Sequence, residues 1–417
     1  MSNSFGLGDA IGVAGSSAHL RQHNSRTVLD VITRSDAALR VVEIMRTTGL
    51  SRPTVETVAE GLLAQGWVTV TEPDEKAQSR GRGRPARLYR FNATAAHVIG
   101  VDIGAHSVAA SIADMRGNVV ASVRERVFPS MGARERLAIA TDAIHGLSAR
   151  AGVALSNVLA VTVGTPGTVG REDDRVGKSP GMPGWPEFDV AATLREAVEC
   201  EVVLENDANL AAVGERAQGV ARDYGDVLFL LLGERLGAGV ISNGALIRGR
   251  DGAAGEIGYV QAEGSEDRDP AFGPLESMVN ASALIKLGRE ALASHPDGRL
   301  AELCEGDPAK LTAEAITLAA TEGDPAASTA LRGLARVLAR GVAPALLTLN
   351  PEMMVVGGGI SRGGHVLRDE LQGALKDLLL YPPEIRMSAL GDEAVLAGAL
   401  DQSIRRVELE VLSKVSA

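Results

Sequence analysis

Two short segments carry the side chains with which this chain could bind or convert a ligand. Glu205-Asn206-Asp207-Ala208-Asn209 follows the apolar run Val202-Val203-Leu204, which predicts an amide and a carboxylate at the end of a buried strand, where open α/β sheets bind ligands. The turn Gly255-Glu256-Ile257-Gly258-Tyr259 supplies a second carboxylate framed by glycines. Because a carboxylate accepts hydrogen bonds from hydroxyl groups with or without catalysis, the two segments predict a pocket for a polyol or a sugar. The alternative is that Asn206 and Asp207 only cap the helix predicted over residues 208–218.

A helix-turn-helix pattern precedes these segments. Apolar periodicity predicts a helix over Ser25–Thr33, a second helix that Ser35 or Asp36 caps and that includes Leu39, and a third over Ser51–Gln65. A glycine between the last two helices suits a tight turn, and such a pair is typical of motifs whose second helix enters the major groove. Hydroxyl and guanidinium side chains at the start of that helix are the candidate DNA contacts, namely Ser51, Arg52, Thr54 and Thr57.

A hairpin is predicted behind the third helix, with strands over Trp67–Val70 and Arg87–Phe91. Its loop alternates arginine with glycine, and no acidic residue stands between Lys76 and Phe91. A basic loop whose glycines carry no side chains can place arginines in a narrow minor groove. Further candidate DNA contacts are therefore Arg80, Arg82 and Arg84. The combination predicts a winged helix-turn-helix that binds double-stranded DNA. Taken singly, the loop also fits a solvated hairpin tip, and the helices also fit a three-helix bundle for protein contact.

The remainder of the chain contains a duplicated strand pattern. Residues 98–123 form two predicted strands, a Gly117-Asn118 turn and a third strand, and residues 226–247 repeat this plan with an Asn243-Gly244 turn. Helices follow each copy, so we expect two similar α/β lobes around a cleft, a plan that resembles the actin/hexokinase-like (ribonuclease H-like) fold. The expected domains are a disordered tail over 1–20, the winged helix-turn-helix over 21–95, and lobes over 96–215 and 216–417, with the last helix packing back on the first lobe.

Composition is consistent with a soluble, cytoplasmic, multidomain protein. The chain has 417 residues, 45% of them hydrophobic and 3% aromatic, which is enough for two or three cores built mainly from aliphatic side chains. No membrane-length apolar run or secretion signal is recognisable. The net charge is -11, but residues 1–95 hold 12 Lys/Arg against 9 Asp/Glu, a net of +3 that leaves -14 on the other 322. Only the first part is therefore expected to meet a polyanion.

The motifs follow one another as in the repressor, ORF and kinase (ROK) family, which the chain resembles over nearly its whole length. They are the helix-turn-helix, Asp102-x-Gly104, Gly164-Thr165-Pro166-Gly167, Glu205–Asn209, Gly255–Tyr259 and Asn350–Gly359. The resemblance implies that Asp207 matches the base of the family's kinases and that Asn206, Glu256 and Glu276 match sugar contacts. The helix-turn-helix places the chain with the family's transcriptional regulators.

Both phosphate hairpins depart from the family's kinase pattern. The first reads Asp102-Ile103-Gly104-Ala105-His106-Ser107 and lacks the usual second glycine, hydroxyl and lysine; the second reads Gly233-Glu234-Arg235-Leu236-Gly237. A phosphate needs free backbone N–H groups and no carboxylate beside it. What the resemblance leaves is a degenerate nucleotide site, made of Asp102, Gly104, Gly233, Gly237 and Gly358. We therefore expect no cofactor, and weakened binding of ATP and Mg²⁺.

The family's zinc site is also missing from the sequence. Tyr259 stands at the usual histidine, and Gln261–Pro274 contains no cysteine, so no metal is expected. Tyr259 is either a ligand contact or an aromatic core residue. Gly181 stands where the family commonly has asparagine, and the loop behind it is expected to bring Trp185 towards the cleft.

These observations favour a sugar-responsive transcriptional regulator, a repressor, that binds an inverted-repeat operator as a homodimer or tetramer and takes a sugar or phosphosugar as effector. Asp207 would then be a vestige of the kinase. A second hypothesis is an active ATP-dependent sugar kinase with a DNA-binding head. A third is a regulator whose cleft is a scaffold controlled by a protein partner.

Overall fold

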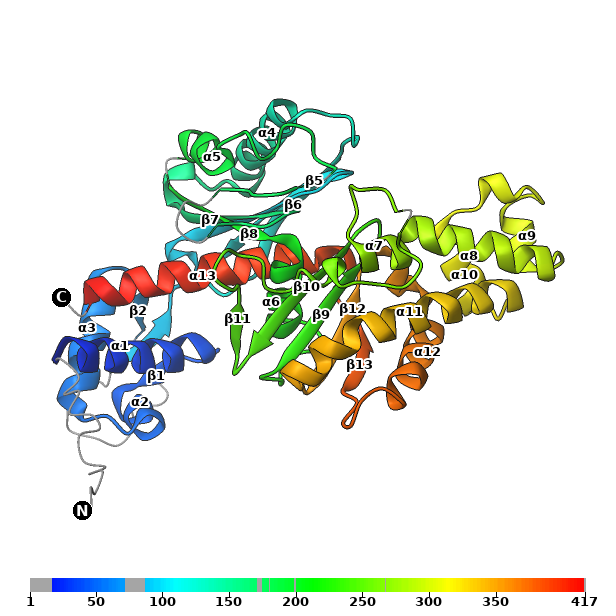
Figure 1. Ribbon diagram of the computed structural model, residues 1–417. Helices are drawn as coiled ribbons and strands as arrows, with labels where there is room; N and C mark the ends of the chain where they lie inside the picture. The colour runs from blue at the N-terminus through cyan, green and yellow to red at the C-terminus, as the bar shows by residue number, and fades with distance from the viewer. Residues whose placement is uncertain are drawn as a thin grey trace, which may run out of the picture. The chain divides into compact units, whose positions relative to one another are not determined.

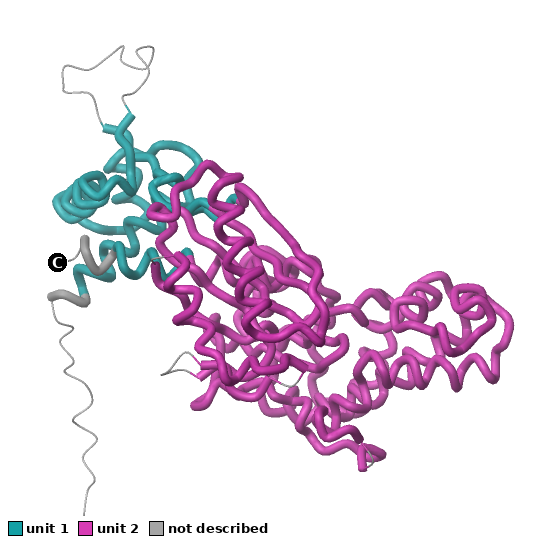
Figure 2. Tube along the Cα trace, turned by 90° about the horizontal axis from the view of Figure 1, so that it is seen from above, with its two compact units in different colours: residues 1–96, 114–118, 404–417 teal, residues 97–113, 119–403 magenta. Residues whose placement is uncertain are grey.

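A computed structural model of the protein describes residues 17–71, 87–170, 175–179, 181–198, 200–266 and 268–415. The chain forms two compact units, shown in Figure 2. The first, which we call the head, comprises Met1–Ala96, Asp114–Asn118 and Ile404–Ala417. The second, the body, comprises His97–Ala113 and Val119–Ser403.

The described part of the head comprises three complete helices, the end of the last helix of the chain and a small antiparallel sheet (Figure 1). Its helices are α1 (Ser17–Arg34), α2 (Val41–Thr48) and α3 (Arg52–Ala64), and its strands β1 (Leu39–Arg40), β2 (Val68–Thr71) and β3 (Leu88–Phe91) lie in the order β1-β3-β2. Gly49 adopts a left-handed conformation (φ 72°) behind α2, and the Ser51 hydroxyl accepts a hydrogen bond from the Thr54 N–H at the start of α3. The predicted helix-turn-helix and hairpin are thus confirmed.

The second helix begins later than the sequence pattern predicts. Leu39 lies in strand β1 opposite Tyr89, and the cap of α2 is Arg40, whose N–H donates to the Glu43 carboxylate at 2.7 Å. Neither Ser35 nor Asp36 caps this helix. The prediction was wrong because Leu39 belongs to strand β1, which pairs with β3 of the hairpin. Local periodicity does not reveal pairing with a strand that lies far away in the sequence.

The body is built on two five-stranded sheets of matching plan (Figure 1). In each, an antiparallel three-strand hairpin unit continues into two parallel strands, as the duplicated pattern predicts. The first sheet has the order β6-β5-β4-β7-β8, with β4 (His97–Ile103), β5 (Ser107–Asp114), β6 (Val119–Arg126), β7 (Val158–Thr165) and β8 (Glu201–Asn206). The second has the order β11-β10-β9-β12-β13, with β9 (Val227–Leu232), β10 (Leu236–Ser242), β11 (Ala245–Ile247), β12 (Met353–Gly357) and β13 (Glu384–Met387).

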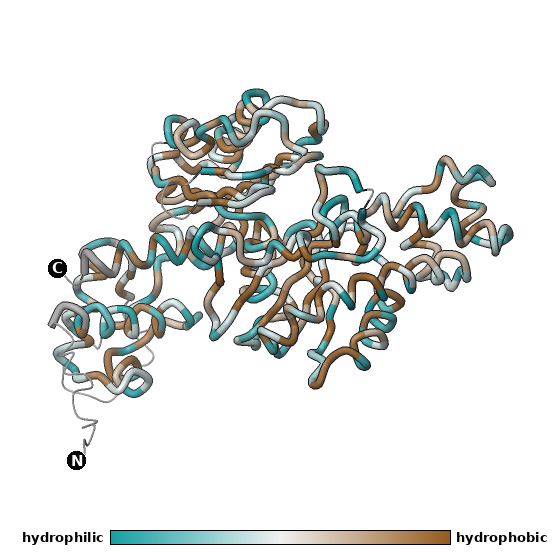
Figure 3. Tube along the Cα trace, in the orientation of Figure 1, coloured by the Kyte–Doolittle hydropathy of each residue, from teal (hydrophilic) through white to brown (hydrophobic). Residues whose placement is uncertain are grey.

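Helices cover the sheets and complete the hydrophobic cores, whose apolar strands are visible in Figure 3. The first core takes in α4 (Ala133–Ala151) and α5 (Val190–Val198). The second core takes in α7 (Pro274–Val279), α8 (Ala281–Ser294), α9 (Arg299–Leu303), α10 (Ala313–Thr321), α11 (Pro325–Leu349) and α12 (Gly364–Lys376). Short 3-10 helices lie at Ala93–Ala95, Leu155–Asn157, Ile257–Tyr259, Pro308–Lys310, Gly359–Gly363 and Gly391–Glu393.

Two helices, α6 (Asp207–Ala217) and α13 (Ala394–Val415), cross in close contact between the sheets. A Cβ on Gly398 would lie 1.9 Å from the Leu210 carbonyl oxygen, and one on Gly214 would lie 2.2 Å from the Ala394 oxygen. Glycine is required at both positions because the two backbones meet there directly. On its other side α13 contacts the first sheet, where the Ser403 hydroxyl is 2.7 Å from that of Thr162.

Among the described helices, none is both long and apolar enough to cross a bilayer. The same part of the chain holds no group of three or more His, Cys, Asp or Glu side chains arranged to bind a metal ion.

Candidate functional site

The five predicted ligand-binding residues, Asn206, Asp207, Glu256, Tyr259 and Glu276, line one cavity of about 350 Å³ in the body. They come from the end of β8, the start of α6, the 3-10 helix behind β11, and α7. The volume falls at the lower end of the range for small-molecule pockets, which suits a monosaccharide-sized ligand. Residues far apart in the sequence are thus brought together as predicted.

Asn206 and Asp207 have a structural task as well as a place in the pocket. The Asn206 side chain accepts from the Asn209 N–H at 3.1 Å, which caps α6, and donates to the Gly167 carbonyl at 3.1 Å. One Asp207 oxygen accepts from the Ala208 N–H at 2.8 Å. Asn206 therefore caps the helix, and both residues also line the cavity.

A buried carboxylate behind the pair fixes its position. Glu205 is 4% exposed, and it accepts hydrogen bonds from the Asn206 N–H and from the Asn209 side chain, each at 2.9 Å. Its second oxygen receives Arg248 Nε at 2.5 Å. Because this carboxylate is balanced by a cation and several donors, it holds the strand end rigid beneath the pocket.

Glu276 is fully occupied by its own chain. Its two oxygens accept from the N–H groups of Leu236 and Gly273 at 3.2 and 3.0 Å and from Arg235, with Nε at 3.0 Å and the terminal nitrogen at 3.1 Å. Arg235 is further held by the Ala271 carbonyl and stacks 4.8 Å from the centre of the Phe272 ring. In this arrangement Glu276 holds Arg235 in place at the pocket wall.

The carboxylates that remain open to the pocket have raised pKa values. Burial raises the pKa of Asp207. Burial, followed by the neighbouring charges of Asp207 and Glu276, raises that of Glu256. Arg235 opposes both shifts. Such groups accept hydrogen bonds strongly once desolvated, so they suit the hydroxyl groups of a ligand.

Tyr259 is not a core residue. It is 53% exposed and lines the pocket, which leaves the ligand-contact alternative. Trp185, by contrast, is fully buried in the first core, where its Nε1–H donates to the Thr165 hydroxyl at 2.7 Å. The expectation that its loop carries it towards the cleft was wrong, because the indole fills the core beside β7.

A larger cavity of about 590 Å³ adjoins the pocket and shares Asp207 and Arg235 with it. Four of the five residues of the predicted degenerate nucleotide site line this cleft cavity, namely Asp102, Gly104, Gly233 and Gly358, whereas Gly237 lines the smaller pocket. Burial and the facing Asp207 carboxylate raise the pKa of Asp102 to about 7. Gly358 (φ +84°) is also required sterically, since a Cβ there would lie 2.5 Å from the Leu232 oxygen.

The tips of the two hairpins are joined to each other. His106 Nε2 lies 2.7 Å from a Glu234 carboxylate oxygen, and both side chains are more than half exposed. The backbone N–H groups of Gly104 and Gly233 bond within their own turns, to Ser107 and Arg235. A carboxylate and an imidazole thus occupy the hairpin tips where a phosphate would need bare backbone.

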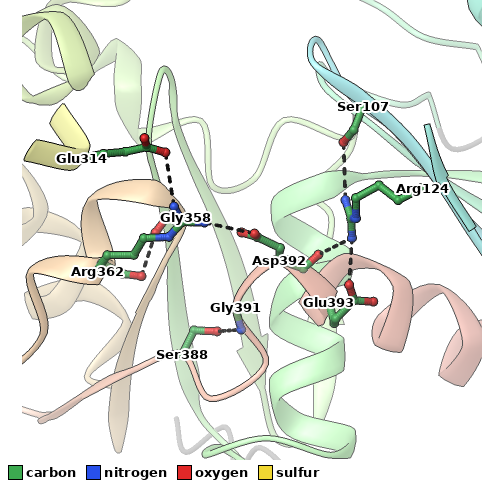
Figure 4. A network of polar contacts seen from close by, with 10 residues as sticks. Ser107, Arg124, Glu314, Gly358, Arg362, Ser388, Gly391, Asp392 and Glu393 are labelled. Atoms are coloured by element: carbon green, nitrogen blue, oxygen red, sulfur yellow. Dashed lines mark hydrogen bonds and ion pairs between the residues drawn. The ribbon is translucent and has the colours of Figure 1, made fainter. Parts of the chain in front are cut away.

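A second set of polar contacts links the first sheet to the segment ahead of α13 (Figure 4). Arg124 on β6 donates to the Ser107 hydroxyl at 3.4 Å, to the Asp392 carbonyl at 3.2 Å and to Glu393 at 2.9 Å. The Asp392 carboxylate in turn receives Arg362 at 3.1 Å. These contacts lie at the wall of the cleft cavity, which Ser107, Arg124 and Asp392 line.

The structure adds polar pocket residues that the sequence analysis did not select, among them Thr168, Lys178 and Arg235. Arg235 was considered only as a neighbour of phosphate. Its contact with Glu276 joins positions 41 residues apart, and no sequence pattern marks it. Lys178 is exposed and belongs to a connection without regular structure.

In the head, the start of α3 carries its predicted DNA contacts at the surface. Ser51, Arg52 and Thr57 are exposed and Thr54 is half-buried. Arg52 Nε is held by Glu56 at 2.8 Å, one turn along the helix. The predicted loop contacts Arg80, Arg82 and Arg84 lie outside the described residues.

Comparison with known proteins agrees with this architecture. Residues 98–405 match the family described as ROK, and residues 25–72 match the IclR helix-turn-helix domain. A glucokinase of Thermotoga maritima is 30% identical over 308 residues, 72% of this chain and 95% of its own length. A xylose repressor of Caldicellulosiruptor bescii is 25% identical over 389 residues, 91% of this chain and 95% of its own.

Two solved structures show the same fold at different coverage. A ROK family glucokinase from Streptomyces griseus, in complex with glucose and AMPPNP, superposes with a TM-score of 0.65 at 29% identity, covering 73% of this chain and 98% of its own. A ROK family transcriptional regulator, described as a homolog of the E. coli MLC protein, superposes with a TM-score of 0.79 at 21% identity, covering 95% of this chain and 99% of its own.

Proposed function

The chain belongs to the ROK family, and from this premise we propose that it is a DNA-binding transcriptional repressor whose body binds a sugar. The observation that carries the proposal is the combination, in one chain, of an IclR-type helix-turn-helix with a ROK body in which the five predicted ligand-binding residues line one pocket. The similarity to the xylose repressor extends over 91% of the chain, whereas the similarity to the glucokinase covers 72%.

In this function the head supplies contacts to the operator. The exposed start of α3 offers Arg52 for a base edge or a phosphate and hydroxyls for phosphates. A helix-turn-helix protein that binds an inverted repeat does so as a symmetric dimer, and we propose a homodimer or a dimer of dimers. The net charge of +3 over residues 1–95 favours approach to DNA at low salt.

The body supplies the sensor. Asp207 and Glu256 accept hydrogen bonds from sugar hydroxyls. The Asn206 amide, which uses one N–H and one lone pair within the chain, offers its second N–H and second lone pair to the ligand. Tyr259 forms one side of the pocket. Arg235 places a guanidinium beside them. A ligand that binds one conformation of the two lobes more tightly than another shifts the population towards it, which changes operator affinity.

A specific observation also favours the second hypothesis, an active sugar kinase: Asp207 is retained at the wall shared by the pocket and the cleft cavity. Against turnover stand the bridged hairpin tips, because His106 and Glu234 occupy the place of phosphate contacts. We propose that the protein has no kinase activity and requires neither ATP nor metal. A coupled ADP-release assay with D-glucose and D-xylose is expected to give the same rate for the wild type and Asp207→Asn. A wild-type rate that falls in this variant would establish the kinase.

The regulator is tested by DNA binding with and without sugar. An operator fragment is selected from random-sequence DNA with the full chain, and its affinity is measured by fluorescence anisotropy against a panel that includes D-glucose, D-xylose and their phosphates. We expect at least one sugar to change the affinity, and Glu256→Gln to abolish the response while leaving sugar-free DNA binding unchanged. Glu263→Gln, an exposed position outside the pocket, is the matched control. An operator affinity that no sugar alters would refute the sensor.

A further inference from the structure

Two elements begin at the cleft and end in the head. The β5–β6 hairpin starts beside the hairpin tip at His106, and the turn that joins its strands, Asp114–Asn118, belongs to the head. Helix α13 starts directly behind Asp392 and Glu393, and its residues from Ile404 onward belong to the head. At eight residues per strand and 22 in the helix, these elements are about 26 and 33 Å long.

The hairpin turn is held by hydrogen bonds of its own and by contacts with other residues of the head. The Asp114 carboxylate accepts from the N–H groups of Arg116 and Asn118 at 2.8 and 3.0 Å, which locks the turn. Arg116 donates to the Ser35 carbonyl at 2.7 Å and to Asp36 at 3.1 Å, and it stacks on the Phe91 ring. These contacts reach the connection between α1 and α2, so a shift of the turn would be felt by the helix-turn-helix.

At the other end the same two elements are tied together. Arg124, on the cleft end of β6, joins Ser107 on β5 to Glu393 and the Asp392 carbonyl at the start of α13. In its first turns α13 contacts the backbone of α6 at Gly398. Helix α6 begins at Asp207, which lines the pocket. A displacement of α6 on ligand binding would therefore reach α13 without an intervening flexible segment.

We propose that the β5–β6 hairpin and α13, clasped by Arg124 at the cleft, are the mechanical link through which occupancy of the pocket changes operator affinity. The inference rests on the proposed sugar-responsive regulation. Arg124 is here a coupling residue: it lines the cleft cavity but is absent from the lining of the smaller pocket and from the predicted DNA contacts, and its removal separates two elements that otherwise move together.

The test measures the coupling factor, the ratio of operator affinities without and with sugar, for the full chain. The wild type is compared with Arg124→Gln, which breaks the clasp, and with Arg126→Gln, a neighbouring exposed arginine on the same strand and the same face. The probes are D-glucose and D-xylose, and sugar affinity is measured separately by calorimetry.

We expect Arg124→Gln to lower the coupling factor to about a third of the wild-type value or less, from a wild-type factor in the usual range of about 5–150. Its affinities for sugar alone and for DNA alone should stay within about threefold of the wild type, and Arg126→Gln should retain the full factor. The charge swap Arg124→Glu with Glu393→Arg should recover more than half of it.

Results other than these would contradict either the link through Arg124 or the proposed regulation by sugar. A full coupling factor in Arg124→Gln would overturn the link, and so would a lost sugar affinity in that variant, because Arg124 would then act on binding. A wild-type factor of one with every sugar rejects the proposed regulation itself, and that result is recognisable before any variant is made.

Discussion

Asp102 is expected to make the body less stable as the pH rises from about 4 to about 7. Its side chain lines the cleft cavity, and burial together with the facing Asp207 carboxylate raises its pKa from 3.8 to about 7. In the unfolded chain the pKa is about 3.9. Between these two values the folded protein binds the proton and the unfolded chain does not, so the free energy of unfolding falls with rising pH across this interval.

The size of the effect follows from the shift. A shift of about 3 pH units at about 1.4 kcal/mol per unit corresponds to a ceiling of about 4 kcal/mol. Because Asp102 borders a cavity that admits water, screening reduces the cost, and we expect about 2 kcal/mol between pH 4 and pH 8. The Asp102→Asn variant keeps the shape and removes the charge. It should therefore be about 2 kcal/mol more stable than the wild type at pH 8 and equally stable near pH 4.

Urea unfolding at pH 4.5, 6 and 8 measures this difference. The chain has two tryptophans, one in the head and one in the body, so a Trp67→Phe background leaves Trp185, which is fully buried, as a reporter of the body alone. Asp226 is the control of opposite sign, because hydrogen bonds from Ser242 and Asn243 lower its pKa. Asp226→Asn should lose stability at neutral pH, and the loss should shrink as the pH falls. A stability difference between wild type and Asp102→Asn that is the same at all three pH values would refute the reasoning.

Three further changes test the packing and the sites. Gly398→Ala should lower the free energy of unfolding by about 1–3 kcal/mol or more, because the new methyl group would lie 1.9 Å from a backbone oxygen of α6. Its control, Gly146→Ala, has no atom within 4 Å of the new methyl group and should raise the free energy of unfolding by about 0.5–1 kcal/mol. Thermal unfolding compares the two variants. Arg235→Ala should cost about 1–3 kcal/mol in urea unfolding, since it leaves a buried carboxylate without its cation, and an unchanged midpoint would contradict that pairing. Arg52→Ala should weaken operator binding by about 1–3 kcal/mol in anisotropy titrations, whereas Glu56→Ala, which frees that arginine, should not weaken it.

The parts of the fold that could be predicted from the sequence are those set by local chemistry. The duplicated hairpin units follow from alternating apolar runs joined by Asn243-Gly244 and Gly117-Asn118 turns, and both pairs of strands form as expected. The start of α3 was predicted because Ser51 and the proline behind it carry an N-terminal cap in their own residue types. Asn206 and Asp207 were predicted because they follow an apolar run that marks a strand end of an α/β sheet. Glu256 was predicted from its glycine-framed turn, whereas Glu276 and Tyr259 were selected through the family resemblance.

What could not be predicted depends on contacts between distant positions. Leu39 enters a strand because β3, some fifty residues later, offers it a partner. Trp185 is drawn into a core instead of a cleft by the Thr165 hydroxyl, which local sequence does not reveal. The bridge between His106 and Glu234 joins two hairpins separated by 128 positions. Each residue type was noticed in the sequence, but its partner lay outside any window over which a pattern can be counted.

The hairpin tips separate two properties that a sugar kinase needs together. In the proposed function, sugar binding depends on the floor of the pocket, where Glu205 is hydrogen-bonded to Asn206 and Asn209 beside Asp207. Phosphoryl transfer depends in addition on backbone N–H groups held open at both tips. Under the proposed function, the bridge between His106 and Glu234 stands at the tips in place of phosphate contacts and leaves the floor of the pocket unchanged. The same contact joins hairpins of the two five-stranded sheets, so under the proposed function it stabilises one arrangement of the lobes that a sugar would favour or oppose.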